Sequence, residues 1–281
     1  MSRKKSFLII TLVYAIAGAC AIGLYIFLPF EFWLNLLICD VAATAIVFAF
    51  SLIFKNASVY DPYWSVQPIV ITLALAAKYA FNLSSVLLIL VIAFWGIRLT
   101  ANWAYTFNGM NHQDWRYTML CEKTGKFYPI VNFLGIHLFP TLVVYLCVLP
   151  AAFVIKEQAE FNPYCIIGLA VSFVATLLQL FSDMQMHKFR KLKSGGFIRT
   201  GLWKYSRHPN YLGEILMWWG VAISSLTLLK ASYFLVAGAT VNTLMFLFVS
   251  IPMADKRQSR KENFNEYKKQ TRMLLPVKKF H

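Results

Sequence analysis

The fold is decided by residues 201–220, which read Gly-Leu-Trp-Lys-Tyr-Ser-Arg-His-Pro-Asn-Tyr-Leu-Gly-Glu-Ile-Leu-Met-Trp-Trp-Gly. This stretch begins as a basic, aromatic loop. After Pro209 it continues as an apolar helix, because proline fits a first helical turn, where its missing N–H costs nothing. Arg207 and His208 are therefore predicted just outside a helix N-terminus, and Glu214 about one turn inside the helix.

A helix start with this sequence suits an anion. Unpaired backbone N–H groups and the positive end of the helix dipole add to the charges of Lys204 and Arg207. We therefore expect a phosphate-bearing cofactor here. The alternative is a membrane helix whose basic flank rests on lipid headgroups.

Composition places the chain in a membrane. Of its 281 residues 59% are hydrophobic, and the mean hydropathy is +0.58, whereas soluble globular domains are usually about 45–50% apolar. The net charge of +15 could suggest a nucleic-acid partner, but such a protein collects its charge on a soluble domain. The sequence predicts no such domain, so we expect no nucleic acid.

The apolar runs predict an all-α, polytopic bundle of seven or eight transmembrane helices, since a spanning helix needs about 20 residues. Eight runs lie near residues 7–29, 33–54, 65–81, 84–104, 129–155, 162–187, 210–229 and 232–254. The third is short and follows a polar run, and a half-helix there would make the count seven. We divide the chain into N-terminal transmembrane helices, 1–54, and a domain with cofactor-binding loops and a basic tail, 55–281.

The basic residues predict the orientation. With the N-terminus in the cytosol, 24 of the 27 Lys and Arg residues fall on the inner side, as the positive-inside rule requires. Both termini, and the opening of the active site, are therefore expected on the cytosolic face of a bacterial inner membrane or its equivalent. The basic segment 256–279 is expected to close partly over the cofactor and to lie partly on anionic lipid.

Polar side chains inside the spans are the candidates for function, because an intramembrane charge is costly unless it is paired or faces a cavity. They are Asp40, Asp61, Arg98, Asn102, Asp183 and Glu214. All but Asp40 are predicted near the cytosolic ends of their helices, which favours one polar cavity open to the cytosol. The five cysteines have no paired spacing, and we expect neither disulfides nor a metal site.

The motifs resemble those of a known family. Ser182-Asp183, then Arg190, then residues 201–214 are similar to the C-terminal domain of the steroid 5-alpha-reductase superfamily, above all to its uncharacterised bacterial members. Those members also resemble this chain in Tyr60-Asp61-Pro62-Tyr63-Trp64 and in Asp114-Trp115-Arg116-Tyr117. The similarity covers roughly residues 55–275. It implies an NADPH-dependent membrane reductase that saturates a carbon–carbon double bond conjugated to a ketone.

The resemblance implies a set of cofactor-binding residues. Asp183, Arg190, Tyr205, Asn210 and Glu214 match family positions, and Arg98 lies where the family has a cofactor-binding arginine. Neighbouring side chains that we add are Asn102, Arg116, Tyr117, Arg199, Arg207, His208, Tyr211, Lys256 and Arg260. Lys256 and Arg260 stand where vertebrate members have other residues, so the adenosine end of the site departs from the family pattern.

The substrate end departs further, because no Gln-Glu pair aligns with the one that orients the ketone in vertebrate members. We assign Tyr60 and Asp61 as catalytic replacements by their chemistry, together with Glu214. Hydride addition to an enone puts negative charge on the carbonyl oxygen, which a tyrosine hydroxyl or a protonated carboxyl can stabilise. The expected partners are a lipophilic small molecule and membrane lipid.

Two other functions remain open at this point. Membrane methyltransferases that act on isoprenylcysteine or phospholipid headgroups share the Arg-His-Pro-x-Tyr-x-Gly pattern of residues 207–213 and bind S-adenosylmethionine with it. They usually carry a Glu-Glu pair on the last cytosolic helix, where this chain has Asp255-Lys256-Arg257-Gln258. A lipid-binding or transport protein is the non-enzymatic alternative, although it would more naturally gather its polar groups near the midplane.

Overall fold

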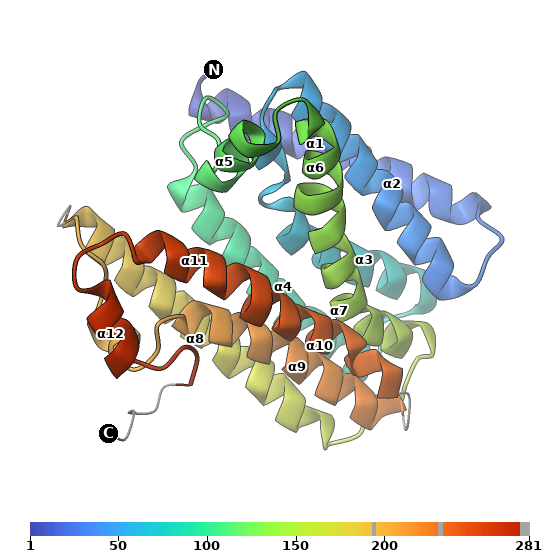
Figure 1. The fold of residues 1–281 in the computed structure, drawn as a ribbon. Helices are drawn as coiled ribbons and strands as arrows, with labels where there is room; N and C mark the ends of the chain where they lie inside the picture. The colour runs from blue at the N-terminus through green and yellow to red at the C-terminus, as the bar shows by residue number, and fades with distance from the viewer. Residues whose placement is uncertain (193–194, 230–232, 276–281) are drawn as a thin grey trace.

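The structure, a computed structural model, describes residues 1–192, 195–229 and 233–275 (Figure 1). Within those ranges it is built from helices, and its one β-type contact is an isolated bridge between Ser206 and Arg272. The principal helices are α1 (Arg3–Phe27), α2 (Phe32–Ile53), α3 (Tyr63–Tyr79), α4 (Leu83–Thr106), α5 (Trp115–Thr124), α6 (Tyr128–Val131), α7 (Phe139–Lys156), α8 (Cys165–Lys191), α9 (Pro209–Leu229), α10 (Ala237–Met245), α11 (Ile251–Gln258) and α12 (Phe264–Gln270). The predicted all-α class is confirmed.

Seven helical segments in the described part of the chain are long and apolar enough to cross a membrane. The third predicted run corresponds to α3, which has 17 residues and is not among the seven, so the lower of the two predicted counts is the one found. One boundary differs more: the run predicted at 129–155 lies within a continuous helical segment, Trp115–Lys156, that π-helical turns at Asn132–Leu138 join together.

Local sequence signals explain where the key helices begin. α9 starts at Pro209, as the position of the proline predicted. α4 begins with a capping box, in which the Asn82 side chain accepts from the Ser85 N–H and the Ser85 hydroxyl accepts from the Asn82 N–H. The proline removes one N–H group that a helix start would otherwise leave unpaired, and the capping box pairs two.

α8 and α9 pack against each other more extensively than any other pair of helices, and they lie side by side in Figure 1. Small residues line this contact: a Cβ added at Gly220 would lie 2.5 Å from the Gly168 carbonyl oxygen, and one at Gly213 would lie 2.7 Å from the Ala175 carbonyl oxygen. Ser172 also donates a hydrogen bond of 2.9 Å to the Met217 carbonyl. Close backbone approach through small residues is typical of helices that associate in lipid.

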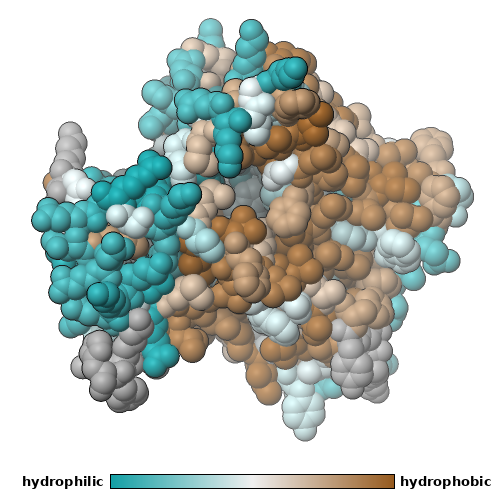
Figure 2. Space-filling view, in the orientation of Figure 1, coloured by the Kyte–Doolittle hydropathy of each residue, from teal (hydrophilic) through white to brown (hydrophobic). Residues whose placement is uncertain are grey.

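The buried apolar residues that the structure describes form three clusters, one of which is shared by α2, α3, α4 and α7. Around Trp95 and Trp218, α4, α7, α8, α9 and α10 share a second apolar cluster. α1, α2 and the segment before α3 share the third, which contains Tyr60 and Tyr63. Hydrophilic residues gather at the left and top of the view in Figure 2, where α5, α11 and α12 lie, and hydrophobic residues cover most of the rest of this face.

We call the end of the bundle that carries α5, α11, α12 and residues 201–208 the polar end. The first residues of the chain also reach α4 and the α4–α5 loop, since Arg3 donates to the Ala104 carbonyl at 2.7 Å and the Met1 ammonium to Asn111 at 3.0 Å. That this end faces the cytosol stays a prediction from the positive-inside rule. The last part of the predicted basic tail, residues 276–279, lies outside the described residues.

The contact between α8 and α9 yields a first prediction. Gly220→Ala places a methyl group against the Ser172 hydroxyl and 2.5 Å from the Gly168 carbonyl oxygen, so the helices must move apart. We expect a loss of about 1–3 kcal/mol in stability, measured as a lower midpoint of thermal unfolding in detergent. Gly18→Ala on α1 is the matched control, because nothing lies within 4 Å of its added Cβ. Equal midpoints for the two variants would contradict the contact.

Candidate functional site

The centre of the candidate site is Arg98 on α4. Its guanidinium donates a hydrogen bond of 2.8 Å to Asp183 on α8, and it also donates to the side-chain oxygen of Gln179, one turn earlier on the same helix. The Arg98 side chain is 5% exposed. The Nε of Arg98 and the amide nitrogen of Gln179 are buried without a hydrogen-bond partner. The pair therefore holds α4 to α8 and leaves two buried donors unused.

Glu214 on α9 lies beside this pair and is also buried. Each of its carboxylate oxygens accepts from an indole N–H, one from Trp95 on α4 at 2.8 Å and one from Trp218 at 3.0 Å. Trp95 and Trp218 meet edge to face, with ring centres 4.8 Å apart. Two neutral donors satisfy the carboxylate, and the Arg98 charge acts on it as well. α4, α8 and α9 thus bring one cation and two carboxylates together.

A cavity of about 420 Å³ borders this group between the second halves of α4 and α8. Arg98 and Asp183 line it at one end. Nearby, Asn102 and His187 are hydrogen-bonded at 2.7 Å, and the Tyr105 ring packs edge to face on His187. The predicted residues Arg98, Asn102 and Asp183 are therefore brought together. The lining is Arg98, Ala101, Asn102, Tyr105, Leu180, Asp183, Met184, His187, Lys188 and Lys191.

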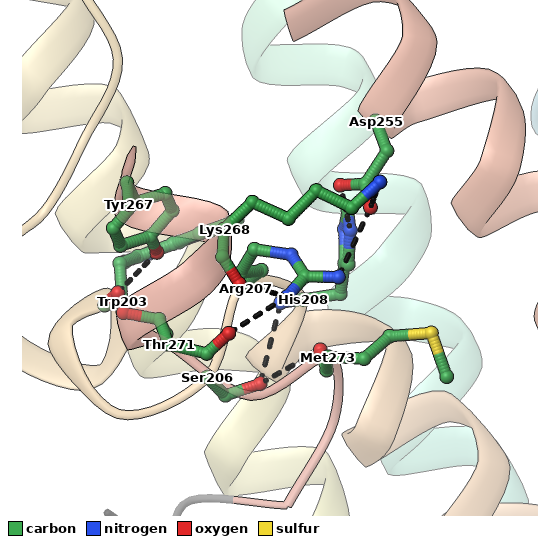
Figure 3. Close-up of polar contacts among 9 residues, drawn as sticks. All are labelled: Trp203, Ser206, Arg207, His208, Asp255, Tyr267, Lys268, Thr271 and Met273. Atoms are coloured by element: carbon green, nitrogen blue, oxygen red, sulfur yellow. Dashed lines mark hydrogen bonds and ion pairs between the residues drawn. The ribbon is translucent and has the colours of Figure 1, made fainter. Parts of the chain in front are cut away.

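Arg207 and His208, just before α9, are held by a residue that sequence reasoning assigned no role. Asp255 on α11 accepts hydrogen bonds of 3.0 Å from both, one on each carboxylate oxygen (Figure 3). Lys268 on α12 lies 3.6 Å from the same carboxylate. All but Lys268 are buried. Arg207 and His208 thus have an internal carboxylate as their partner, and the phosphate-bearing cofactor expected at this helix start stays a prediction.

Arg207 also forms hydrogen bonds with residues 271–272, which follow α12. The Arg207 guanidinium donates to the Thr271 carbonyl at 2.7 Å (Figure 3), and its backbone N–H donates to the Arg272 carbonyl at 3.0 Å. The Tyr267 hydroxyl donates to the Trp203 carbonyl. Burial raises the pKa of Tyr267 to about 12, so this donor keeps its proton at neutral pH. α12 and residues 271–273 therefore pack on the loop that precedes α9.

A second acidic group lies between α2 and α3. The Tyr117 hydroxyl on α5 donates to Asp61 at 2.7 Å. Burial raises the pKa of the Asp61 carboxyl to about 6, although the Tyr117 hydrogen bond and the Arg116 charge lower it. Arg116 itself pairs with Asp114 at 2.8 Å, and Arg257 on α11 lies 4.1 Å from the Trp115 ring centre. Predicted residues Asp61, Arg116 and Tyr117 are therefore neighbours.

The Tyr60 hydroxyl does not join the hydrogen bond between Asp61 and Tyr117. Tyr60 is 2% exposed, and its hydroxyl is hydrogen-bonded to Thr141 on α7 at 2.8 Å. Asp40, the one acid that the sequence analysis placed away from the others, accepts from Tyr63 at 3.2 Å and from Gln67. Beside the cavity at Arg98, the described residues form hydrogen-bonded networks around Glu214, Asp255, Asp61 and Asp40.

The other predicted residues lie at the polar end. Tyr211 stacks on His208 with ring centres 5.2 Å apart, and the charges of Arg116, Asp114 and Asp183 act on its phenol. Asn210, on the first turn of α9, is half-buried. Five further side chains belong to exposed residues, namely Arg190, Arg199, Tyr205, Lys256 and Arg260.

The sequence analysis did not assign a role to the residues that hydrogen-bond to the predicted site residues. Gln179 and Trp218 stand four positions from Asp183 and Glu214 on their own helices, a spacing that could have revealed them. Trp95 and Asp255 reach their partners from distant parts of the chain, and no local spacing signals them. In the described residues no group of three or more His, Cys, Asp or Glu side chains could hold a metal ion, and the five cysteines are free.

The Asp255 contacts generate a second prediction. Asp255→Ala leaves Arg207 and His208 buried without their carboxylate, and removing one partner of a buried pair costs about 3–5 kcal/mol. We expect a lower unfolding midpoint and faster proteolysis after α11. Asp114→Asn is the control, because the Arg116 and Asp114 side chains of its ion pair are 48% and 26% exposed and its capping oxygen is retained. Equal protease resistance in both variants would show that Asp255 does not hold the C-terminal segment.

Comparisons with known proteins match this chain to one family over most of its length. The family model described as "Protein of unknown function (DUF1295)" matches residues 47–271. An uncharacterized protein of Schizosaccharomyces pombe is 29% identical over 194 residues, which cover 58% of this chain and 56% of that protein. No solved structure gives a significant match.

Steroid-processing enzymes also match. The protein named 3-oxo-5-alpha-steroid 4-dehydrogenase 1 is 29% identical in Macaca fascicularis and 28% identical in Homo sapiens, over 117 residues in each case. The match covers 41% of this chain and 41% or 42% of those enzymes, so the chain spans less than half of their length. The predicted superfamily is confirmed, and its bacterial branch stays a prediction. The family model matches residues 47–271, which is most of the chain and includes Asp61, Arg98, Asp183 and Glu214. The chain therefore belongs to the DUF1295 family of the steroid 5-alpha-reductase superfamily.

Proposed function

We propose that the protein is an integral-membrane reductase. It uses NADPH to saturate a carbon–carbon double bond conjugated to a ketone in a steroid-like or other lipophilic substrate. The distant similarity to 3-oxo-5-alpha-steroid 4-dehydrogenase 1 supports this class of reaction. The observation that carries the proposal is the group formed by Arg98, Asp183 and Glu214, which three spanning helices bring together. Charged groups inside spans are kept where they serve a function.

The residues around Arg98 fit a nicotinamide cofactor. Gln179 and Arg98 each have a buried N–H without a partner, and such donors suit the oxygens of a carboxamide and a ribose. The carboxylates of Asp183 and Glu214 can accept from hydroxyl and amide groups. The phosphates need cations, and Arg190, Arg199 and Lys256 belong to the exposed residues that can supply them.

When bound, the reduced nicotinamide supplies a hydride to the β carbon of the enone. The chain's own residues hold both reactants, exclude water and stabilise the negative charge that develops on the carbonyl oxygen. One well-placed donor at that oxygen is worth about 2.7–4 kcal/mol. On the substrate side, Asp61 is the proposed acid. Tyr60 as donor stays a prediction from the sequence, and in the structure its hydroxyl is engaged by Thr141.

The first test is cofactor binding. At about 100 times its dissociation constant, a ligand that binds only the folded state adds about 2.7 kcal/mol of stability. We expect NADPH to raise the unfolding midpoint of the detergent-extracted protein, NADH to do so less, and S-adenosylmethionine not at all. Stabilisation by S-adenosylmethionine alone would replace the reductase with a methyltransferase.

The second test is the role of α9. Asn210→Ala and Glu214→Gln remove polar groups that are proposed to contact the cofactor, and a lost charge-assisted hydrogen bond costs about 1.5–3 kcal/mol. We expect NADPH-dependent turnover of an enone to fall about tenfold or more in both variants. Without ligand, Asn210→Ala should change the unfolding midpoint little, whereas Glu214→Gln should lower it, because one indole N–H then faces an amide N–H instead of a carboxylate oxygen. Glu160→Gln, at an exposed position near the start of α8, is the matched control. Normal turnover by a well-folded Glu214→Gln variant would exclude Glu214 from the site.

A further inference from the structure

We propose that Tyr117, held by Asp61, is the hydroxyl that donates to the carbonyl oxygen of the substrate. This inference rests on the proposed reductase function and names the donor that the function requires. Tyr117 lies on α5 and Asp61 on the connection between α2 and α3, and their side chains meet at 2.7 Å. A tyrosine fixed by a carboxyl group is suited to move a proton, because the carboxyl can replace what the hydroxyl gives away.

Several contacts hold the two segments together, so the pair is built into the fold. Asn56, before the connection, donates to the Met110 carbonyl at 2.6 Å. The Gln113 side chain accepts from the Ala57 N–H at 2.9 Å, and the Ser58 hydroxyl accepts from the Asp114 N–H at 3.0 Å. The loop that leads into α5 is therefore fixed along residues 56–61.

Aromatic contacts connect this pair to the proposed cofactor site. Trp64 lies three residues after Asp61, and its ring centre is 6.0 Å from that of Trp95. The Trp95 indole in turn donates to Glu214 at 2.8 Å. From the other side, the charges of Arg116 and Asp183 both act on the Tyr211 phenol. The Asp61–Tyr117 pair and the Arg98 group therefore belong to one neighbourhood of the bundle.

The surface leaves access to this neighbourhood. Figure 2 shows a hollow in the face drawn, between α5, α7 and α11. Arg257 on α11 lies against Trp115 on α5, two residues before Tyr117, so these two helices meet close to the pair. The Tyr60 hydroxyl, by contrast, bonds to Thr141, which also bonds to Thr44 at 3.0 Å within the core. Of the two tyrosines, Tyr117 is the one whose hydroxyl is hydrogen-bonded to an acid.

The protonation state of Asp61 decides where the Tyr117 proton points. When Asp61 is ionised it accepts a hydrogen bond from the Tyr117 hydroxyl, as in the structure. When Asp61 is protonated it donates to the Tyr117 oxygen and leaves that hydroxyl free to donate elsewhere. Burial raises the pKa of Asp61 to about 6, so the donating arrangement gains population as the pH falls through that value. The titratable groups that act on Asp61 are Arg116, Asp114, Tyr117, Tyr14 and Tyr60.

The proposed step balances as follows. A hydride adds to the β carbon and forms a C–H bond, and the electrons of the double bond move toward the carbonyl oxygen. That oxygen takes the Tyr117 proton, and Tyr117 regains a proton from Asp61, which is reprotonated from water. The resulting enol becomes the saturated ketone by moving its hydroxyl proton to the α carbon through solvent. The reaction consumes one hydride from NADPH and one proton.

The test reads the hydrogen bond at the carbonyl without any turnover. A steroid with an enone ketone labelled with ¹³C is bound to the detergent-extracted protein in the absence of NADPH, and its C=O stretch is recorded by infrared spectroscopy. A donor lowers this frequency. In the wild type we expect the lowered band to grow as the pH falls from 8 to 5, with a midpoint near the pKa of Asp61.

Three variants separate the possible donors. Tyr117→Phe should lack the lowered band at every pH. Asp61→Asn should show it without pH dependence, because its amide N–H donates permanently to the Tyr117 oxygen. A lowered band that persists in Tyr117→Phe, or that disappears in Tyr60→Phe, overturns the assignment. If Tyr117→Phe fails to fold, Asp61→Asn decides alone, since a pH dependence like that of the wild type would also overturn it.

Turnover with NADPH then separates this inference from the function on which it rests. We expect Tyr117→Phe to lower the maximal rate by about 100-fold, a typical effect of a general acid, while stabilisation by NADPH is unchanged. Tyr128→Phe on α6 is the matched control, because its hydroxyl has no hydrogen-bond partner among the described residues. An active wild type with a fully active Tyr117→Phe overturns the donor alone. A wild type that neither binds the enone nor oxidises NADPH with it overturns the reductase and the donor together.

Discussion

A charge can stay inside a bilayer only where another part of the chain neutralises it, and in this protein Arg98 sets that condition for three helices. Its guanidinium needs Asp183 and Gln179 on α8, and the Glu214 carboxylate on α9 needs the Trp95 indole, one turn before Arg98 on α4. Apolar contacts alone would let these helices slide or rotate in lipid. The polar contacts fix how the helices are aligned along one another. The small residues between α8 and α9 let the two backbones come close enough for that alignment.

The position of a helix could be predicted well wherever the evidence for it lies within the residues of that helix alone. Hydropathy reports the cost of moving a single segment into lipid, so the spans were recognisable, and Pro209 marked the start of α9. α3 has 17 residues, and the shortness of this run had already left the predicted count open between seven and eight. α5, α6 and α7 are joined through a 3₁₀ turn at Gly125–Phe127 and π-helical turns at Asn132–Leu138, and this left no recognisable pattern in the residues.

Hydrogen-bond and ion-pair partners that lie on different helices could not be predicted in the same way. Residues 95 and 214 are 119 positions apart, and nothing local to either announces the contact. Reasoning from the helix start predicted an anion near Arg207, and a carboxylate is found there, but it comes from Asp255. The ligand roles of Arg207 and His208 stay predictions. Neighbours in the chain also misled, since Tyr60 and Asp61 are adjacent in sequence, yet their side chains join different networks.

The contact between Arg207 and Asp255 also bears on how the protein is made. The ribosome delivers Arg207 and His208 48 and 47 residues before the carboxylate that neutralises them. Until α11 has been synthesised, the loop before α9 has no internal anion, so it must remain in water or against lipid phosphates. A chain that stops short of α11 would present exposed, unpaired cations and an undocked membrane segment. Those are features of an unfinished protein, and cellular quality control can act on them before a faulty copy accumulates.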